Sequence, residues 1–95
     1  MKKIEIEFTG AAKAITGRKN GIIEISETAS YRDIVAFLAG EFPQLLGSVI
    51  ADDRRSLLSA SFFSRNGEEP IMPDDMNKIP LDGERLVILY YIVGG

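Results

Sequence analysis

The residues of this chain that could take part in chemistry are few, and the most informative are its last two, Gly94 and Gly95. Glycine weakens the end of a strand, because it has no side chain to pack and loses the most conformational entropy on ordering. A backbone without Cβ atoms can, however, thread a narrow tunnel in another protein and present a terminal carboxylate there. We therefore interpret Gly95 as a candidate reactive carboxylate, with Gly94 and Val93 as the threading segment. The alternative is an ordinary frayed chain end.

Other reactive groups are scarce, since the sequence contains no His and no Cys. It therefore lacks the side chain that most readily exchanges protons near neutral pH, a thiolate nucleophile and any zinc–thiolate site. No phosphate-binding loop of the G-x-x-x-x-G-K-[ST] type is present. The acidic pairs Glu68-Glu69 and Asp74-Asp75 lack the spacing of a calcium loop and are interpreted as solvated charges. We expect a protein that is not itself an enzyme and has no metal or cofactor.

Composition sets the outer bounds. A chain of 95 residues that is 45% hydrophobic has room for one domain with one core. The net charge of -3 argues against nucleic acid as the main partner, because phosphate binding requires a basic face. No apolar stretch has the length of a membrane span or the form of a signal peptide. We expect a cytoplasmic protein that binds no membrane.

The first half of the chain predicts a hairpin and a helix. Alternating apolar and polar residues predict a strand over 3–9, 10–20 is expected to be a loop, and 22–26 is expected to be a second strand. Ser30 and Asp33 have the spacing of a capping box, and the apolar spacing after them predicts about three helical turns. Pro43 marks the end of this helix and the start of a possible further short turn.

The second half predicts further strands. A charged surface loop over 51–59 is followed by a short strand over 61–65 and the turn signal Asn66-Gly67. Prolines make 68–78 irregular, and the apolar run 86–93 is expected to be a central strand. Together these elements predict an α+β fold, a mixed sheet packed on one main helix. The first and last strands are expected to lie side by side and parallel in its middle.

The last predicted strand also suggests a binding surface. Val87, Leu89 and Tyr91 share one face of it, and the exposed Lys3, Glu5 and Glu7 of the first strand indicate that this face points away from the helix. We interpret Val87, Leu89 and Tyr91 as a partner-docking row. The alternatives are that a loop, 51–59 or 68–80, covers the row, or that the residues are apolar for packing alone.

Taken in order, the sequence resembles the ubiquitin-like β-grasp sulfur carriers, chiefly the small subunit of molybdopterin synthase and the thiamine-biosynthesis sulfur carrier. The matching segments run from one end of the chain to the other, and each is weak by itself. They are Ile4-Glu5-Ile6-Glu7-Phe8, the stretch 25–34, Phe42-Pro43-Gln44-Leu45, Ser64-Arg65-Asn66-Gly67, the stretch 80–89 and Gly94-Gly95.

The resemblance implies a β-grasp domain over 1–93 and a flexible Gly-Gly tail over 94–95. It implies that an ATP-dependent partner of the ubiquitin-activating type adenylates the carboxylate of Gly95, and that a sulfur donor converts the adduct to a thiocarboxylate. Cofactor biosynthesis of the molybdopterin type is the use that it favours, and it allows a large synthase subunit as a second partner. Two alternatives remain: a ubiquitin-like modifier joined to lysines through Gly95, and a β-grasp interaction module whose tail has no chemical role.

Overall fold

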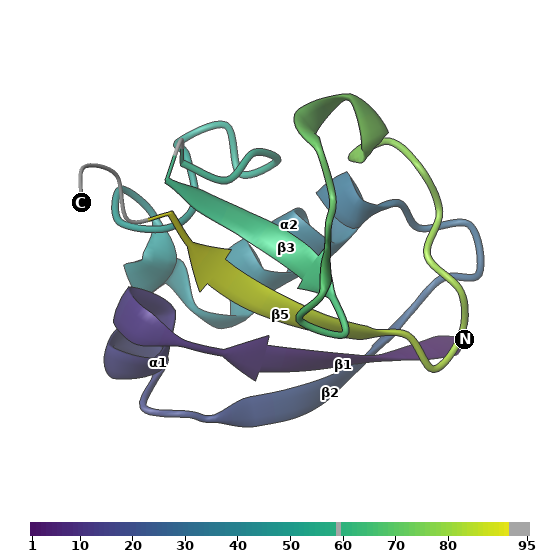
Figure 1. Ribbon diagram of the computed structural model, residues 1–95, viewed down its shortest axis with the longest axis horizontal. Helices are drawn as coiled ribbons and strands as arrows, with labels where there is room; N and C mark the ends of the chain where they lie inside the picture. The colour runs from purple at the N-terminus through teal and green to yellow at the C-terminus, as the bar shows by residue number, and fades with distance from the viewer. Residues whose placement is uncertain (59, 92–95) are drawn as a thin grey trace.

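The computed structural model describes residues 1–58 and 60–91 and contains one five-stranded mixed sheet with a helix across one face (Figure 1). The order of the strands in the sheet is β2-β1-β5-β3-β4. The elements, in chain order, are β1 (Lys2–Phe8), α1 (Gly10–Thr16), β2 (Asn20–Ile25), α2 (Tyr31–Glu41), the short 3₁₀ helix η1 (Pro43–Leu45), β3 (Ser61–Arg65), β4 (Glu69–Pro70), the 3₁₀ helix η2 (Pro73–Asp75) and β5 (Arg85–Tyr90).

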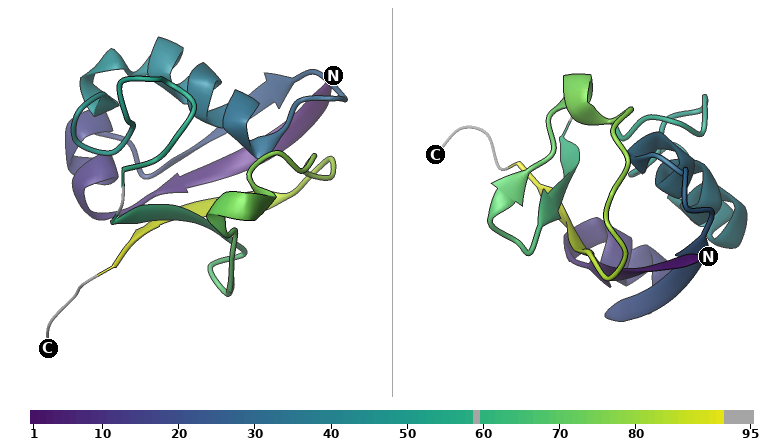
Figure 2. Two further views of the ribbon diagram at one scale, coloured as in Figure 1. Left: turned by 90° about the horizontal axis from the view of Figure 1, so that it is seen from above. Right: turned by 90° about the vertical axis from the view of Figure 1, so that its right-hand side faces the viewer.

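The middle of the sheet is formed by the first and last strands, as the sequence predicts. β1 and β5 are parallel, with Glu5 opposite Arg85 and Phe8 opposite Ile88. β2 and β3 pair antiparallel on the two outer sides of this pair. Figure 2 shows α2 lying along one face of the sheet, so the strands have one covered face and one outer face. The predicted α+β sheet on one main helix is confirmed.

The core lies between the sheet and α2, because both elements carry apolar residues at the period of their own structure. Ile4, Ile6 and Phe8 of β1 are buried. Lys3, which precedes them, is exposed, and Glu5 and Glu7 between them are half-buried. On α2 the buried residues follow helical spacing: Tyr31, Ile34, Val35, Leu38 and Ala39. The predicted capping box begins this helix, since the Ser30 hydroxyl accepts from the Asp33 N–H and the Asp33 carboxylate accepts from the Ser30 N–H.

Lys2 is a charged residue inside this structure, with 2% of its surface exposed. Its ammonium group donates to the carbonyl oxygens of Glu27, Ala29 and Pro80 at 3.1, 3.0 and 2.8 Å. The three donors of the group are thus matched by three acceptors, which is the condition under which a buried charge is tolerated. Lys2 thereby joins the start of β1 to two loops from distant parts of the chain.

The predicted loop over 10–20 is wrong in its first half, where the structure has the helix α1. Three alanines, the best helix formers, fall within its seven residues. Gly17 does not interrupt a loop but caps the helix: it adopts the left-handed conformation with φ +68°, and its N–H donates to the carbonyl of Lys13 at 2.9 Å. The glycine that indicated a loop in the sequence is therefore the end signal of a helix.

The segment 68–78 is largely irregular, as predicted, but it contains β4 and η2. Asn66 and Gly67 both have positive φ, which is typical of the tight turn that joins two antiparallel strands. The turn brings Glu69 and Pro70 beside the end of β3. The two helices of the described residues, of 7 and 11 residues, are too short to cross a membrane.

Candidate functional site

The site predicted from the sequence begins where the central strand ends. β5 reaches Tyr90, and the next residue still holds to the sheet, because the Tyr91 N–H donates to the carbonyl of Ala60 at 2.7 Å. Gly95, Gly94 and Val93, and with them the expected boundary between domain and tail, lie outside the described residues. The structure describes the surface around the end of β5, the strand that precedes these residues in the chain.

The outer face of β5 carries the predicted docking row, and the structure divides it. Tyr91 is exposed and Leu89 is half-buried, whereas Val87 has only 3% of its surface exposed. Val87 is covered by the turn after β3: a Cβ atom on Gly67 would lie 3.6 Å from its Cγ2. The exposure expected of Val87 is therefore wrong, because the hairpin of β3 and β4 folds over this end of β5. A docking role for Leu89 and Tyr91 remains a prediction.

Phe62 belongs to the same surface and was missed by the sequence reasoning. It stands opposite Leu89 in the β3–β5 ladder, and its ring stacks on that of Tyr91 with the centroids 4.3 Å apart. The signal was present in the sequence, since Phe62 and Phe63 are adjacent in a predicted strand and successive residues of a strand face opposite sides. Phe62, Leu89 and Tyr91 form what we call the exit patch.

The outer face is charged where β1 lies beside the start of β5. Arg85, at the start of β5, forms ion pairs with Glu5 at 3.2 Å and Glu7 at 2.8 Å on the neighbouring β1. The hydrogen bond to Glu7 raises the pKa of Arg85 above its ordinary value. The outer face thus changes from charged over β1 to apolar at the exit patch, which lies at the end of β5 that precedes the tail.

The opposite end of β5 is anchored by a buried hydrogen-bond network. Glu84 directly precedes the strand, and 7% of its side chain is exposed. Its carboxylate accepts from the Tyr31 hydroxyl at 2.6 Å and from Nε of Arg65 at 3.2 Å, and Nη2 of Arg65 donates to the Tyr31 oxygen at 2.8 Å. Burial and the bond to Glu84 raise the pKa of Tyr31 to about 12. The helix α2, the strand β3 and the start of the central strand β5 therefore share one junction.

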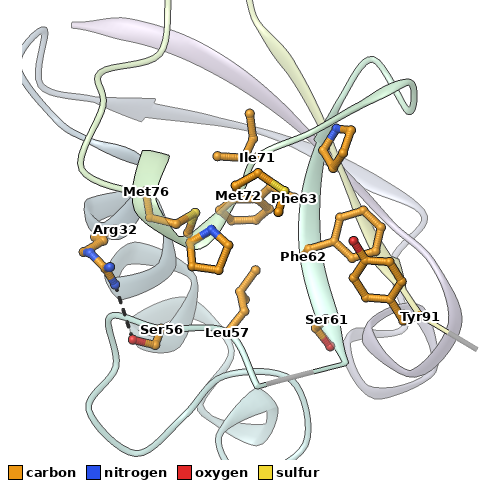
Figure 3. A pocket seen from close by; sticks show the side chains of 12 residues that line it. Arg32, Ser56, Leu57, Ser61, Phe62, Phe63, Ile71, Met72, Met76 and Tyr91 are labelled. Carbon is orange, nitrogen blue, oxygen red and sulfur yellow. Dashed lines mark hydrogen bonds between the residues drawn. The ribbon is translucent and has the colours of Figure 1, made fainter. Parts of the chain in front are cut away.

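A pocket of about 330 Å³ lies beside the exit patch, between β3 and the segment that follows β4 (Figure 3). Phe62 and Tyr91 form one side of it, and the Arg32 guanidinium, which donates to the Ser56 hydroxyl at 3.4 Å, lies on the other. Its interior is apolar and includes the sulfur-bearing side chains of Met72 and Met76. The sequence reasoning did not predict this pocket, because its walls come from segments that lie far apart in the sequence, the helix α2, the strand β3 and the stretch that follows β4.

The acidic pairs noted in the sequence are not brought together. Asp75 forms an ion pair with Lys78 at 3.1 Å, and Glu69 forms one with Arg65 at 2.7 Å. Within residues 1–58 and 60–91 no group of three or more His, Cys, Asp or Glu side chains could hold a metal ion.

The sheet order, the parallel central pair and the single covering helix define the ubiquitin-like β-grasp fold. Solved structures of this fold match nearly the whole chain. The crystal structure of SAMP1, a small archaeal modifier protein of Haloferax volcanii, has 22% sequence identity and a TM-score of 0.79, with 98% of this chain and 99% of that chain covered.

Two further matches carry different names. A putative molybdopterin converting factor, subunit 1, from Pyrococcus furiosus has 15% identity, a TM-score of 0.75 and coverage of 97% of this chain and 100% of that one. Urm1 from Trypanosoma brucei has 13% identity, a TM-score of 0.71 and coverage of 99% and 96%. No family model and no curated protein matches the sequence. The expected β-grasp fold is confirmed, and identities this low establish the fold alone.

Proposed function

We propose that this protein is a sulfur carrier that acts through the carboxylate of Gly95. The observation that carries the proposal is that the central strand β5 ends at Tyr90, five positions before Gly95. Five residues span at most about 17 Å when extended, so the body of the domain must sit close to any site that acts on Gly95. The exit patch lies at this point and would be the surface that such a partner contacts.

The chemistry of this role requires nothing that the chain lacks. A carboxylate is a poor electrophile, so one oxygen of the Gly95 carboxylate first attacks the α-phosphorus of ATP, with release of pyrophosphate. A sulfide equivalent then attacks the acyl carbon, AMP leaves, and a thiocarboxylate remains. The activating partner supplies the nucleotide site and the catalytic groups. In this scheme the protein is a substrate and carrier, and its thiocarboxylate serves cofactor biosynthesis of the molybdopterin type, with or without a large synthase subunit.

A second candidate function is favoured by the names of the similar structures. SAMP1 is named as a modifier protein, and it is matched over almost its full length. A modifier shares the adenylation step with a sulfur carrier and differs in the nucleophile that follows. If an amine replaces the sulfur donor, Gly95 becomes joined to a lysine of another protein by an amide bond, and AMP is again released.

The experiment is intact mass spectrometry of the full chain after incubation with ATP in extract of its own cell. A mass increase that corresponds to replacement of one oxygen by sulfur supports the sulfur carrier, provided that it is found for the wild type and not for a variant that lacks Gly95. For the modifier, trypsin cleavage after Arg85 leaves the segment 86–95 on the acceptor lysine, where a digest would reveal it. An unchanged Gly95 in an extract shown to contain an activating enzyme would overturn both and leave the interaction module.

A further inference from the structure

The two edges of the sheet differ in how open they are to another strand. β4 is two residues long, and one of the two is Pro70, which has no N–H to donate. β2, at the other edge, has six residues, no proline and an isoleucine, Ile22, with 69% of its surface exposed. Natural sheets shorten or block their edges with such devices to prevent strand addition. Here β4 is both short and blocked by a proline, whereas β2 has neither of these two devices.

The main chain of β2 presents unused hydrogen-bonding groups along this open edge. Phe8 donates to Lys19 at 2.8 Å, which sets the alternation of the β1–β2 ladder: Gly21, Ile23 and Ile25 bond to β1. The N–H and C=O groups of Ile22 and Glu24 therefore point away from the sheet. Among the described residues no other segment bonds to them. Two residues of β2 can thus take up a further strand without breaking any bond of the fold.

A groove of about 310 Å³ runs beside this edge, between β2 and α2. Its apolar lining includes the half-buried side chains of Ile23, Phe37 and Phe42. A strand added to β2 would place every second side chain on the same face as Ile23, toward this groove. The edge of β2 therefore has both open main-chain groups and, on the face toward α2, an apolar groove that alternate side chains of an added strand could enter.

The charges of the rim indicate what kind of strand fits. Glu24 and Glu41 are exposed at the groove, and neither forms an ion pair within residues 1–58 and 60–91. The only cation lining the groove in the described part of the chain is Arg18, whose guanidinium lies 5.7 Å from the centre of the Phe42 ring. The two carboxylates are thus available to a basic partner, whereas an acidic one would meet like charge.

We propose that the edge of β2 is a docking site for an extended segment of another protein, which adds to the sheet as a sixth strand. The segment has apolar side chains at alternate positions, directed into the groove beside Phe37, and Lys or Arg at its flanks, directed to Glu24 and Glu41. Strand addition of this kind takes its affinity from main-chain bonds and its specificity from alternate side chains. The proposal is independent of the chemistry at Gly95.

The test uses the full chain and the synthetic peptide Lys-Val-Thr-Val-Thr-Val-Lys. In a nuclear magnetic resonance titration we expect the largest shifts along β2 and the facing side of α2, and slowed amide exchange at Ile22 and Glu24. Two further peptides carry N-methyl groups either on both Thr amides or on the two Val amides that each follow a Thr. Only one of these two sets points at β2, the Thr set for an antiparallel strand and the Val set for a parallel one. One methylated peptide should bind about tenfold more weakly, and the other should bind like the parent.

Two protein variants check the same point from the other side. Ile22→Pro removes an outward N–H and no bond to β1, so it should abolish binding, while Ile22→Thr keeps the N–H and should bind. A further peptide has Glu in place of both Lys residues and should bind more weakly than the parent. Equal binding of both methylated peptides, shifts centred on the exit patch, or tighter binding of the peptide with Glu would overturn the proposal. A dimer that is detected by sedimentation and abolished by Ile22→Pro would also overturn the proposal, because a second copy of this chain would then occupy the edge. The peptide comparison decides the matter even if Ile22→Pro does not fold.

Discussion

Tyr31 and Glu84 are 53 positions apart in the sequence, and the hydroxyl of the first donates to the carboxylate of the second at 2.6 Å. The bond joins the first residue of α2 to the residue that precedes the central strand. The β-grasp arrangement of this chain therefore depends on a polar contact at one end of its core, as well as on the apolar packing along it.

Removal of the phenol tests this contact. We expect Tyr31→Phe to lower the free energy of unfolding by about 2 kcal/mol, because the Glu84 carboxylate loses a donor in a buried position. Urea denaturation of both proteins at neutral pH measures the difference. Glu69→Gln is a matched control that removes only the exposed pair with Arg65, and it should change stability by less than about 0.5 kcal/mol.

The same variant should show a characteristic dependence on pH. The pKa of Tyr31 is raised from 10.0 to about 12, so between these values the folded protein keeps a proton that the unfolded chain has lost. The stabilisation that Tyr31 provides is fully present below pH 10 and is lost as the pH rises toward 12. The stability difference between wild type and Tyr31→Phe should therefore shrink over this interval. A constant difference would contradict the assignment of the raised pKa to Tyr31.

We expect substitution of the two neighbouring lysines of β1 to affect the stability of the fold to very different extents. Lys2→Met should destabilise the protein by about 3 kcal/mol, because the carbonyls of Glu27, Ala29 and Pro80 would lose their shared donor. Lys3→Met should cost less than about 0.5 kcal/mol, since the Lys3 side chain is exposed and the bonds of Lys3 to Asp82 and Gly83 are made by its backbone. Thermal unfolding of the two variants compares them directly, and equal losses would show that the carbonyl cluster contributes nothing.

Two glycines make a matched pair for the helices. Gly40 lies inside α2 with open space around its missing Cβ, so Gly40→Ala should raise the free energy of unfolding by about 0.5–1 kcal/mol. Gly17 has equally open space, but its φ of +68° is costly for a residue with a Cβ, and Gly17→Ala should lower stability by about 1 kcal/mol. Denaturant midpoints measure both. If Gly17→Ala were stabilising, the left-handed cap of α1 would be incorrect.

Because Val87 is buried and Leu89 is only half-buried, we expect substitutions at these two positions to affect stability and partner binding differently. Val87→Ala removes two buried carbon groups and should cost about 1.5 kcal/mol of stability, with thiocarboxylate formation in extract retained. Leu89→Ala should cost less stability and reduce the rate of thiocarboxylate formation, because Leu89 lies in the exit patch next to Phe62. The mass-spectrometric assay gives the second quantity and urea denaturation the first. Equal rates for the two variants would remove the exit patch as a docking surface.

The tail has its own test. Gly94→Val places a branched side chain next to the proposed reactive carboxylate, so it should block adenylation while leaving the unfolding transition unchanged. Gly94→Ala adds a single methyl group and should have a smaller effect on the rate. ATP-dependent release of pyrophosphate in extract measures adenylation. Wild-type rates for Gly94→Val would contradict a narrow tunnel at the activating enzyme.

The parts of the fold that could be predicted from sequence are those in which local pattern and tertiary structure agree. The alternation of Ile4, Ile6 and Phe8 and the capping box at Ser30 each indicate one structure, and the folded chain has that structure. The apolar run after Arg85 favours a central strand, and β5 lies between two other strands. The central pair of β1 and β5 could be predicted because each of the two strands has a clear pattern of its own.

The parts that could not be predicted depend on contacts between distant segments. Val87 has the same pattern as Leu89, and only the turn at Gly67 decides that one is buried and the other half-exposed. Lys2 is a polar residue that the chain encloses, because three carbonyls from two loops meet at its ammonium group. The pocket beside the exit patch is likewise made by segments from different halves of the chain, since Arg32 lines it together with Phe62 and Tyr91.

The parallel pairing of β1 and β5 has a mechanical consequence. Because the two strands run in the same direction, tension between the N-terminal end of β1 and the C-terminal end of β5 slides one strand along the other. The hydrogen bonds of the ladder are then loaded together in shear, and they cannot open one after another like a zipper. A load applied through the residues that follow Tyr91 meets the fold in its strongest direction, and we expect the domain to stay intact under a pull that would unravel a sheet from its edge.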